Sequence, residues 1–430
     1  MTTKLGRIVA KAQLDPKLRF TALAHLLTPE FLLETWGQMN RRGASGVDGE
    51  TAEEFGVHLE ERIDALYRKL RSGAYRPPPV RRVDIPKSGG GSRPLGIPTM
   101  EDRVLQRAVA RILGAIYEAD FLDCSYGFRP GRKQHQALKA LRSQFIAGKV
   151  MHVHEADIRG YFNRINHQWL RRMLELRIGD PVILRLITRW LRAGVMDGGL
   201  LKRTPVGSPQ GGPISPILAN VYLHYALDLW FDRLFKRACK GTAYLTRWAD
   251  DFVGCFQYAS DARAFGQALE HRLAKFGLEL APEKTRTLVF GRFARERLAE
   301  TGKKPETFEF LGFRHVCGVD RQGRFAVIRL PSQRSCRSFL NRTKYWLQKH
   351  MHASVWEQQR GLSQKLRGFY QYFALPHCLK KLSWILREVR RQWRRTLRHR
   401  GQRRNRMHWS YLATRAWFQL PTPRSLHPTV

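Results

Sequence analysis

Two adjacent aspartates, Asp250 and Asp251, lie in the stretch AYLTRWADDFVGCF between two runs of strand-forming residues. The runs 243–248 and 252–256 are rich in aromatic and β-branched residues, which predicts two strands joined by a turn that carries both acids. Two carboxylates about 4 Å apart repel each other by roughly 4 kcal/mol at an effective dielectric near 20, so a fold that holds them together normally supplies cations. Because oxygen ligands favour Mg²⁺, this turn is a candidate metal site, although a solvated acidic turn would have the same sequence.

A third acid follows another predicted strand. Residues 150–158 suit a strand, and Asp157 lies near its end. Two-metal chemistry needs acids that converge from separate strands around ions roughly 3.5 to 4 Å apart, and Asp157 with the adjacent pair meets that need. His152 and His154 alternate along the same strand, but two histidines without a third ligand are more typical of packed or solvated positions than of a metal site.

The charge of the chain indicates its partner. Among 430 residues, 43% of them hydrophobic, 76 lysines and arginines oppose 36 acids, for a net charge of +40. This composition predicts a globular protein with a strongly positive field, for which a long polyanion is the natural partner. We find no apolar run approaching 18 residues and no signal peptide in residues 1–24, so we expect no membrane partner and a cytoplasmic location. Six scattered cysteines without a CxxC pair predict buried thiols in a reducing compartment.

The length predicts two to three domains. The first 75 residues show helical patterns at 28–40 and 52–70, which predicts a helical N-terminal extension. The following segment VDIPKSGGGSRPLGIP predicts a strand, a glycine-rich turn and a second strand, with Lys87 before the turn and Arg93 after it. Two cations over a flexible hairpin can bind a triphosphate, although an ordinary basic hairpin would have the same pattern.

The C-terminal region combines a helical apolar stripe with dense positive charge. Ten arginines and a single acid, Glu388, occupy residues 387–406. One face is therefore predicted to pack and the other to bind phosphate, with a solvated basic helix as the alternative. The nearby tryptophans are individually more typical of a core than of base stacking. The apolar stripe comprises Leu382, Ile385, Val389, Trp393 and Leu397, and the tryptophans are Trp384, Trp393, Trp409 and Trp417.

Seven motifs in a fixed order closely resemble the reverse transcriptase of group II intron-encoded proteins. They cover about residues 30–315 and read IPKSGGGSRPLGIPTMEDRVLQ, YGFRPGR, ADIRGYFNRINH, GSPQGGPISPILANVYLH, RWADDFV, LELAPEKT and FEFLGF. The resemblance implies an α+β right-hand polymerase, with fingers and an antiparallel palm sheet in residues 76–318 after the helical extension 1–75. The segment LRGFYQYFALPHC is similar to the maturase (X) domain, which implies an α-helical thumb at 319–395 and a basic nucleic-acid-binding segment at 396–430.

The same resemblance implies roles for individual residues. Asp157, Asp250 and Asp251 become the catalytic acids and bind two Mg²⁺ ions, or Mn²⁺ as a substitute, together with the backbone carbonyl of Ile158. Tyr161 matches the bulky residue that excludes a 2′-hydroxyl and so favours dNTPs. The other implied nucleotide contacts are Lys87, Arg93, Gln210 and Lys284, and the implied nucleic-acid contacts are Trp248, Arg387, Arg391, Arg394 and Arg398. The family usually has tyrosine where this chain has Trp248, which predicts an altered contact with the primer strand.

The implied function is that of an RNA-directed DNA polymerase that also assists splicing and retrohoming of a group II intron RNA. Its partners would be the intron RNA, an RNA template with a DNA primer or target DNA, and dNTPs, in a prokaryotic cytoplasm. A domesticated relative in phage defence, DNA repair or CRISPR spacer acquisition is an alternative, as is a splicing-only RNA-binding maturase with weak polymerase activity. The chain ends at LPTPRSLHPTV without the cysteine-rich HNH endonuclease of many family members, so we expect no second-strand nicking and a short, group IIC-like layout.

Overall fold

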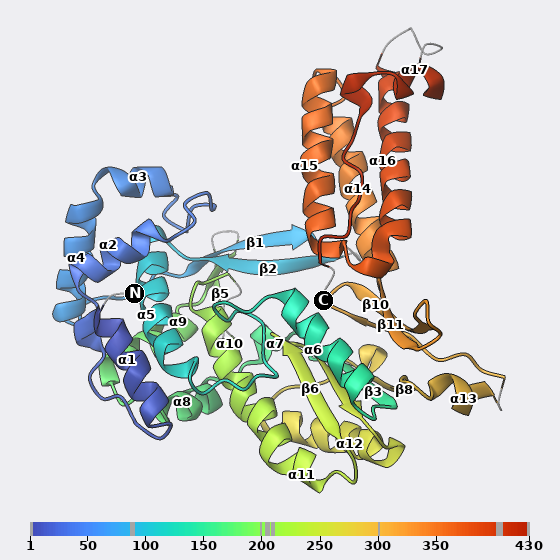
Figure 1. Cartoon of the computed structure of the whole chain (residues 1–430). Coiled ribbons are helices and arrows are strands. Elements are labelled where there is room, and N and C mark those ends of the chain that lie inside the picture. Colours follow the sequence, from blue (N-terminus) through green and yellow to red (C-terminus); the bar gives the residue numbers. More distant parts are fainter. Residues whose placement is uncertain are drawn as a thin grey trace. The chain divides into compact units, whose positions relative to one another are not determined.

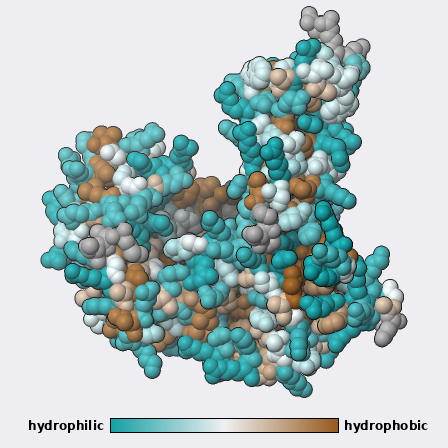
Figure 2. All heavy atoms as spheres, viewed as in Figure 1, coloured by the Kyte–Doolittle hydropathy of each residue, from teal (hydrophilic) through white to brown (hydrophobic). Residues whose placement is uncertain are grey.

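The computed structural model describes residues 3–86, 91–197, 200–202, 207, 211–299, 302–400 and 407–427. The chain forms two compact units. Unit 1 comprises Met1–Lys133, His154–Gly254 and Tyr258–Thr287, and unit 2 comprises Gln134–Val153, Cys255–Gln257 and Leu288–Val430. Hydrophilic side chains cover most of the face seen in Figure 2, as expected for a chain with 76 lysines and arginines. Within the described residues no helix is both long and apolar enough to span a bilayer.

Unit 1 begins with helices. The predicted helix at 28–40 forms as α2, where the Thr28 hydroxyl accepts a hydrogen bond from the amide of Phe31. The helical pattern predicted for 52–70 is confirmed, and the chain forms it as two helices that are separated at His58, with φ −118° and ψ 43°. Gly56 and the β-branched Val57 have low helix propensity and precede this break. These helices are α1 (Thr3–Leu14), η1 (Ala24–Leu26), α2 (Pro29–Gly37), α3 (Ala52–Val57) and α4 (Leu59–Arg71).

A small sheet follows, with strand order β2-β1-β4-β5. Strands β1 (Val80–Pro86) and β2 (Ser92–Ile97) pair antiparallel, with Ile85 opposite Arg93, which confirms the two predicted strands, while residues 87–90 of the predicted turn lie outside the described residues. Strands β4 (Val195–Asp197) and β5 (Leu200–Lys202) complete the sheet. Three further helices of unit 1 each bury an apolar face: α5 (Met100–Tyr117), α8 (His167–Glu175) and α9 (Pro181–Arg192).

A second sheet has the strand order β6-β7-β3-β8. Strand β6 covers Ala243–Trp248 and β7 covers Asp251–Phe256, so both strands predicted around the acidic turn are confirmed. Strand β3 (His152–Asp157) forms within the predicted strand at 150–158, and β8 covers Arg286–Val289. The other elements here are α7 (Tyr161–Arg164), α10 (Ser215–Leu223), η2 (His224–Asp228), η3 (Phe231–Phe235), α11 (Lys236–Ala238), α12 (Ala259–Lys275) and η4 (Pro282–Lys284). Figure 1 shows α10 and α11 as one continuous helical segment, which includes two π-helical stretches, η2 and η3.

Unit 2 combines an antiparallel three-stranded sheet with long helices. In Figure 1 α14, α15 and α16 lie side by side, and all three pairs are in contact. Every member of the apolar stripe predicted on α16 is buried, and the Trp393 indole donates a hydrogen bond of 2.8 Å to the Gln358 side chain. The elements are α6 (Gln134–Ala147), α13 (Ala294–Ala299), β9 (Phe308–Phe310), β10 (Phe313–Val319), β11 (Phe325–Pro331), α14 (Gln333–Lys349), α15 (Val355–Phe373), η5 (Pro376–Cys378), α16 (Leu379–His399), α17 (Trp409–Ala413) and η7 (Ala416–Phe418).

The cysteines are all free thiols, as predicted. Four of them are buried, while Cys124 and Cys239 are half-buried.

Candidate active site

The three predicted acids lie at one edge of the second sheet. Strands β3 and β7 are neighbours, and the amide of Met151, just before β3, donates a 2.9 Å hydrogen bond to the carbonyl of Phe256 at the end of β7. The two strands therefore run antiparallel, which places the end of β3 beside the start of β7. Asp157 is the last residue of β3 and Asp251 is the first residue of β7.

The turn between β6 and β7 has an unusual backbone. Ala249 has φ +56°, in the left-handed region that non-glycine residues rarely adopt. A Cβ atom built on Gly127 would lie 2.4 Å from the Ala249 nitrogen, so only glycine fits against the turn at this position. A left-handed alanine costs of order 1 kcal/mol and persists only where its surroundings fix it. The turn that carries half-buried Asp250 is therefore held by its neighbours.

Asp157 forms an ion pair with Lys284. The amide of Ala281 donates a 2.8 Å hydrogen bond to the Asp157 carbonyl, and the short helix η4 that follows brings Lys284 back to the carboxylate. The side chains of Asp157 and Lys284 are 31% and 56% exposed, so both are accessible to solvent and to a ligand. The resemblance placed Lys284 near the acids, and the structure brings it into direct contact with one of them.

The donor chemistry of this edge fits a hard divalent cation. The three predicted ligands are carboxylates, two on the neighbouring strands β3 and β7 and one in the turn before β7, and carboxylate oxygens are the donors that Mg²⁺ prefers. Across the part of the chain that the structure describes, no three His, Cys, Asp or Glu side chains are grouped closely enough to hold a metal ion. In the structure the positive charge next to Asp157 comes from the Lys284 ammonium. The residues therefore fit a cation by type, with one carboxylate engaged by lysine.

Other predicted contacts around the acids are buried or half-buried. Tyr161 is 2% exposed, and its hydroxyl donates a 2.6 Å hydrogen bond to the carbonyl of Ala219, which fixes the ring. Burial raises the pKa of this hydroxyl well above its ordinary value. Ile158 is also buried and bridges to Leu280. Trp248, next to the turn, is half-buried.

The structure does not describe the side chains of three predicted nucleotide contacts. Lys87 and Gln210 lie outside the described residues, as does the side chain of Arg93, whose backbone belongs to β2. The two histidines on β3 are buried, and His154 shares a 2.9 Å hydrogen bond with the Thr287 hydroxyl while burial lowers its pKa to about 4. Both observations favour the packing interpretation of this histidine over a metal site.

The predicted arginines of α16 differ in their surroundings. Arg387, Arg391 and Arg398 are exposed, and Arg391 pairs with Glu388 at 2.7 Å. Arg394 is half-buried instead: its guanidinium lies 5.1 Å from the centre of the Trp409 ring and donates to the Met407 carbonyl. Arg394 therefore has a packing partner within unit 2, which the sequence did not reveal.

An arginine-lined cavity in unit 1 is a functional candidate that the sequence reasoning missed. It measures about 650 Å³, and Glu175 is the acid in its lining. Burial and the positive charges of the neighbouring Arg76 and Arg185 lower the pKa of Arg189. The arginines are Arg19, Arg76, Arg171, Arg185, Arg189 and Arg192. The spacing of positions 185, 189 and 192 along one helical face of α9 was the available signal.

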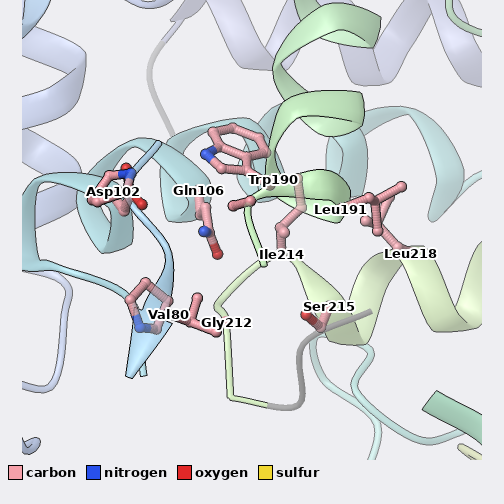
Figure 3. Close-up of a pocket in the computed structure, with 12 residues that line it drawn as sticks. Val80, Asp102, Gln106, Trp190, Leu191, Gly212, Ile214, Ser215 and Leu218 are labelled. Atoms are coloured by element: carbon pink, nitrogen blue, oxygen red, sulfur yellow. The ribbon is translucent and has the colours of Figure 1, made fainter. Parts of the chain in front are cut away.

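A second cavity, shown in Figure 3, has a different character. It lies beside Gln106 of α5 and Gly212, the last residue of the SPQGG motif, and at about 10 Å³ it has room for no more than one water molecule. Asp102 lines it, and burial raises the pKa of this carboxyl to about 7, while the Tyr75 hydroxyl donates to it. This is a packed support for the segment at 211–215, with no room for a substrate.

Comparisons with known proteins agree with this geometry. Residues 85–315, more than half of the chain, match the family described as "Reverse transcriptase (RNA-dependent DNA polymerase)". Protein YkfC of Escherichia coli (strain K12) is 33% identical over 358 residues, covering 77% of this chain and 93% of that protein. The group II intron-encoded protein LtrA of Lactococcus lactis subsp. cremoris is 40% identical over 240 residues, or 53% of this chain and 39% of that protein. An uncharacterized 91 kDa protein in the cob intron of Schizosaccharomyces pombe is 40% identical over 172 residues, 40% of this chain and 21% of that protein.

The chain thus spans most of YkfC and well under half of LtrA. The mixed α/β architecture with antiparallel strands fits a polymerase fold, and the acids, the Lys284 contact and the matched residues all fall in the same region. The resemblance to group II intron-encoded proteins is confirmed, and the chain belongs to the reverse transcriptase family of RNA-dependent DNA polymerases.

Proposed function

We propose that this reverse transcriptase extends a DNA primer on an RNA template with dNTPs and also assists the splicing and mobility of a group II intron RNA. The antiparallel pairing of β3 and β7 is the observation that supports the polymerase site, because it places Asp157 and Asp251 at one sheet edge beside Asp250. The intron-encoded relatives support the second activity.

Reverse transcriptases use divalent metal ions, and we propose two Mg²⁺ ions, with Mn²⁺ as a substitute. Asp157, Asp250, Asp251 and the carbonyl of Ile158 would hold them. When bound, such ions lower the pKa of a hydroxyl nucleophile and neutralise the charge of a triphosphate and its leaving group. Lys284 can move from Asp157 to the triphosphate because its ammonium is held by one exposed ion pair.

The remaining nucleotide contacts support a preference for dNTPs. Tyr161 follows Gly160, whose φ is +57°, and its fixed ring is proposed to exclude a 2′-hydroxyl. Lys87, Arg93 and Gln210 are proposed to contact the incoming nucleotide, and Trp248 the primer strand.

A right-hand layout accommodates these roles. We assign residues 1–75 to an N-terminal extension, 76–318 to fingers and palm, 319–395 to a helical thumb and 396–430 to a basic nucleic-acid-binding segment. RNA backbone would contact the arginine-lined cavity and the exposed face of α16, since arginine binds phosphate through a planar, bidentate fork.

Primer extension on an RNA template tests the polymerase assignment. With Mg²⁺ and dNTPs, wild type should extend the primer, and Asp250→Ala should lose about a thousand-fold or more in rate, since bound metal supplies several kcal/mol and each 1.36 kcal/mol is a factor of ten. Asp123→Ala is the matched control, because Asp123 is an acid of the same unit that is 92% exposed. A wild type without extension activity, or an active Asp250→Ala variant, would contradict the proposal.

The salt dependence of RNA binding tests the basic surfaces. Replacing Arg185, Arg189 and Arg192 with glutamine should reduce the slope of log affinity against log salt by about 0.7 to 0.9 for each lost phosphate contact. The triple variant of Arg387, Arg391 and Arg398 should act in the same way. The Arg324→Gln variant, which removes an exposed arginine already paired with Asp320, is the control. An unchanged slope in either triple variant would mean that the arginines of that surface are solvated and do not contact RNA phosphates.

A further inference from the structure

Arg247 of β6 is a fully buried arginine directly behind the acidic turn. Its side chain and that of Asp228 are both 0% exposed. The guanidinium pairs with the Asp228 carboxylate through Nε at 2.7 Å and Nη2 at 2.5 Å. Burial opposes the charge of Arg247, but the adjacent carboxylate outweighs that effect and raises its pKa above the ordinary value. The pair is thus charged, dry and bidentate.

The other donors of the same guanidinium reach three further groups. Nη1 donates to the Ala249 carbonyl at 2.9 Å and to the Asn220 side chain at 3.2 Å, and Nη2 donates to the Ser125 hydroxyl at 2.7 Å. Arginine has five N–H donors, so each of them has an acceptor here. The Ala249 carbonyl belongs to the left-handed residue that immediately precedes Asp250.

The partners of Arg247 also hold the opposite side of the turn. The Asn220 amide donates a 2.7 Å hydrogen bond to the carbonyl of Gly127, the glycine packed against Ala249. The segment around Ser125 is tied to β6 as well, because Arg247 donates its amide to Cys124 at 2.7 Å and accepts at its carbonyl from Tyr126 at 2.9 Å. The turn is therefore enclosed from two directions by one connected network.

A helical irregularity brings two of these partners together. Asn220 lies in α10, and Asp228 ends the π-helical stretch η2 eight positions later. An α-helical turn of 3.6 residues and a wider π turn with i→i+5 bonding together cover about eight residues. Both side chains consequently face the same guanidinium.

Stability alone gives a weak reason for such a pair. Replacing a buried ion pair with apolar residues of similar volume is often neutral or stabilising, because the desolvation cost offsets the attraction. Apolar side chains, however, could not bind the carbonyl of a left-handed turn residue. The contact with Ala249 is what an apolar pair would lose.

We propose that Arg247 is a positioning residue for the polymerase site: its guanidinium, oriented by Asp228, fixes the Ala249 carbonyl and thereby sets the direction in which Asp250 and Asp251 present their carboxylates to divalent cations. This inference rests on the proposed function of the acids. It adds a residue that does not touch the substrate and acts through the backbone of the turn.

The test is the double variant Arg247→Leu/Asp228→Leu, which removes both charges and so avoids leaving one unpaired in the interior. Two quantities are measured: the rate of primer extension as a function of Mg²⁺, and the binding of Mn²⁺ to the nucleotide-free protein by electron paramagnetic resonance. Groups that orient metal ligands typically contribute 10- to 100-fold to metal affinity or activity. We expect a decrease in kcat and a rise in the half-saturating Mg²⁺ and Mn²⁺ concentrations of about that size, with an unchanged KM for the template–primer.

The matched control is Arg177→Leu/Asp120→Leu. This is another arginine–aspartate pair of unit 1, in which Arg177 is buried and Asp120 is half-buried, with an N–O distance of 2.9 Å. Arg177 likewise binds backbone carbonyls, those of Asp15 and Leu18. Its loss should change the melting temperature without changing the metal dependence. The single variant Arg247→Lys, which retains the charge, should recover part of the metal affinity.

Three outcomes decide the matter. A metal dependence that shifts in the Arg247 double variant and not in the control supports the inference. A double variant that binds Mn²⁺ and extends primers like wild type overturns it, while leaving the proposed function intact. If the wild type does not extend primers and the Asp250→Ala variant still binds Mn²⁺ like wild type, the proposed function is overturned, and this inference falls with it.

Discussion

Two ion pairs flank the candidate acids, one behind the β6–β7 turn and one at the end of β3. Arg247 and Asp228 are both inaccessible to solvent, and Arg247 uses all its donors. Lys284 and Asp157 are partly exposed and share a single contact. The first pair suits a group that must not move during a reaction. The second suits one that exchanges its partner when a cation or phosphate arrives.

The two environments also predict different energies. A buried pair that loses one partner leaves a charge in the interior, whereas an exposed pair is screened by water and contributes little to stability. Variants of the two pairs should therefore separate stability from ligand binding.

The largest effect is expected for Asp228→Ala. Removing this carboxylate leaves the Arg247 charge unpaired inside unit 1 and should lower the free energy of unfolding by about 3–5 kcal/mol. Urea denaturation measures it. The double variant Arg247→Leu/Asp228→Leu should be more stable than Asp228→Ala. Equal stability of the two variants would mean that the unpaired charge is relieved by water, and the contrast with the exposed pair would disappear.

A pH-dependent effect of intermediate size is expected for His224, which lies one turn before Asp228. Burial lowers the pKa of this imidazole from 6.5 to about 4, against the opposing field of Asp228. The unfolded chain therefore takes up the proton first as the pH falls. The stability that neutral His224 contributes is complete above pH 6.5 and is lost between pH 6.5 and about pH 4, by at most about 1.4 kcal/mol per pH unit.

The measurement is the difference in unfolding free energy between wild type and His224→Phe across that window. A difference is needed because burial raises the pKa of Asp102 to about 7 and of Asp120 to about 6, which shifts the stability of both proteins in the opposite direction. The difference between the two curves should be constant above pH 6.5, and below it the wild type should lose stability relative to His224→Phe. Parallel curves across the whole window would show that burial does not lower the pKa of His224.

The smallest effect is expected for Lys284→Ala. The melting temperature should change little, since exposed ion pairs contribute about 0–1 kcal/mol. The half-saturating Mg²⁺ concentration for primer extension should fall by about fivefold, because a competing charge worth about 1 kcal/mol leaves the Asp157 carboxylate. Lys349→Ala, at a lysine of unit 2, is the control for a general change in charge. A large loss of stability in Lys284→Ala would assign both ion pairs to the same structural role.

Local patterns in the sequence predicted much of this site. The run AYLTRW gave the bounds of β6, and the acids were found because two like charges between strands are unusual without a cation. The helical pattern at 52–70 was confirmed, but the break at His58 was not predicted, because Gly56 and Val57 have low helix propensity without a proline that would mark a break. Lys284 was assigned by resemblance, and its contact with Asp157 depends on the bridge between residues 158 and 280.

The two proposed phosphate-binding surfaces show that the local density of arginines along the sequence is an incomplete guide to a basic surface. Arginines clustered along the chain drew attention to α16, where Arg394 packs on Trp409. The cavity of unit 1 also draws arginines from positions 19, 76 and 171, so a short window of sequence shows only the three on α9.

The strands, the acidic turn between them, the apolar stripe of α16 and the expected polyanionic partner could all be predicted from the sequence. These follow from properties of neighbouring residues or of the whole composition. The contacts of Arg247, in the middle of a strand, with Ser125, Asn220 and Asp228 arise from the folded chain and could not be predicted. Those partners are 122, 27 and 19 residues away, and a π-helical stretch aligns two of them. Such a convergence arises from packing, because burying a charge requires that every donor find an acceptor wherever the chain can supply one.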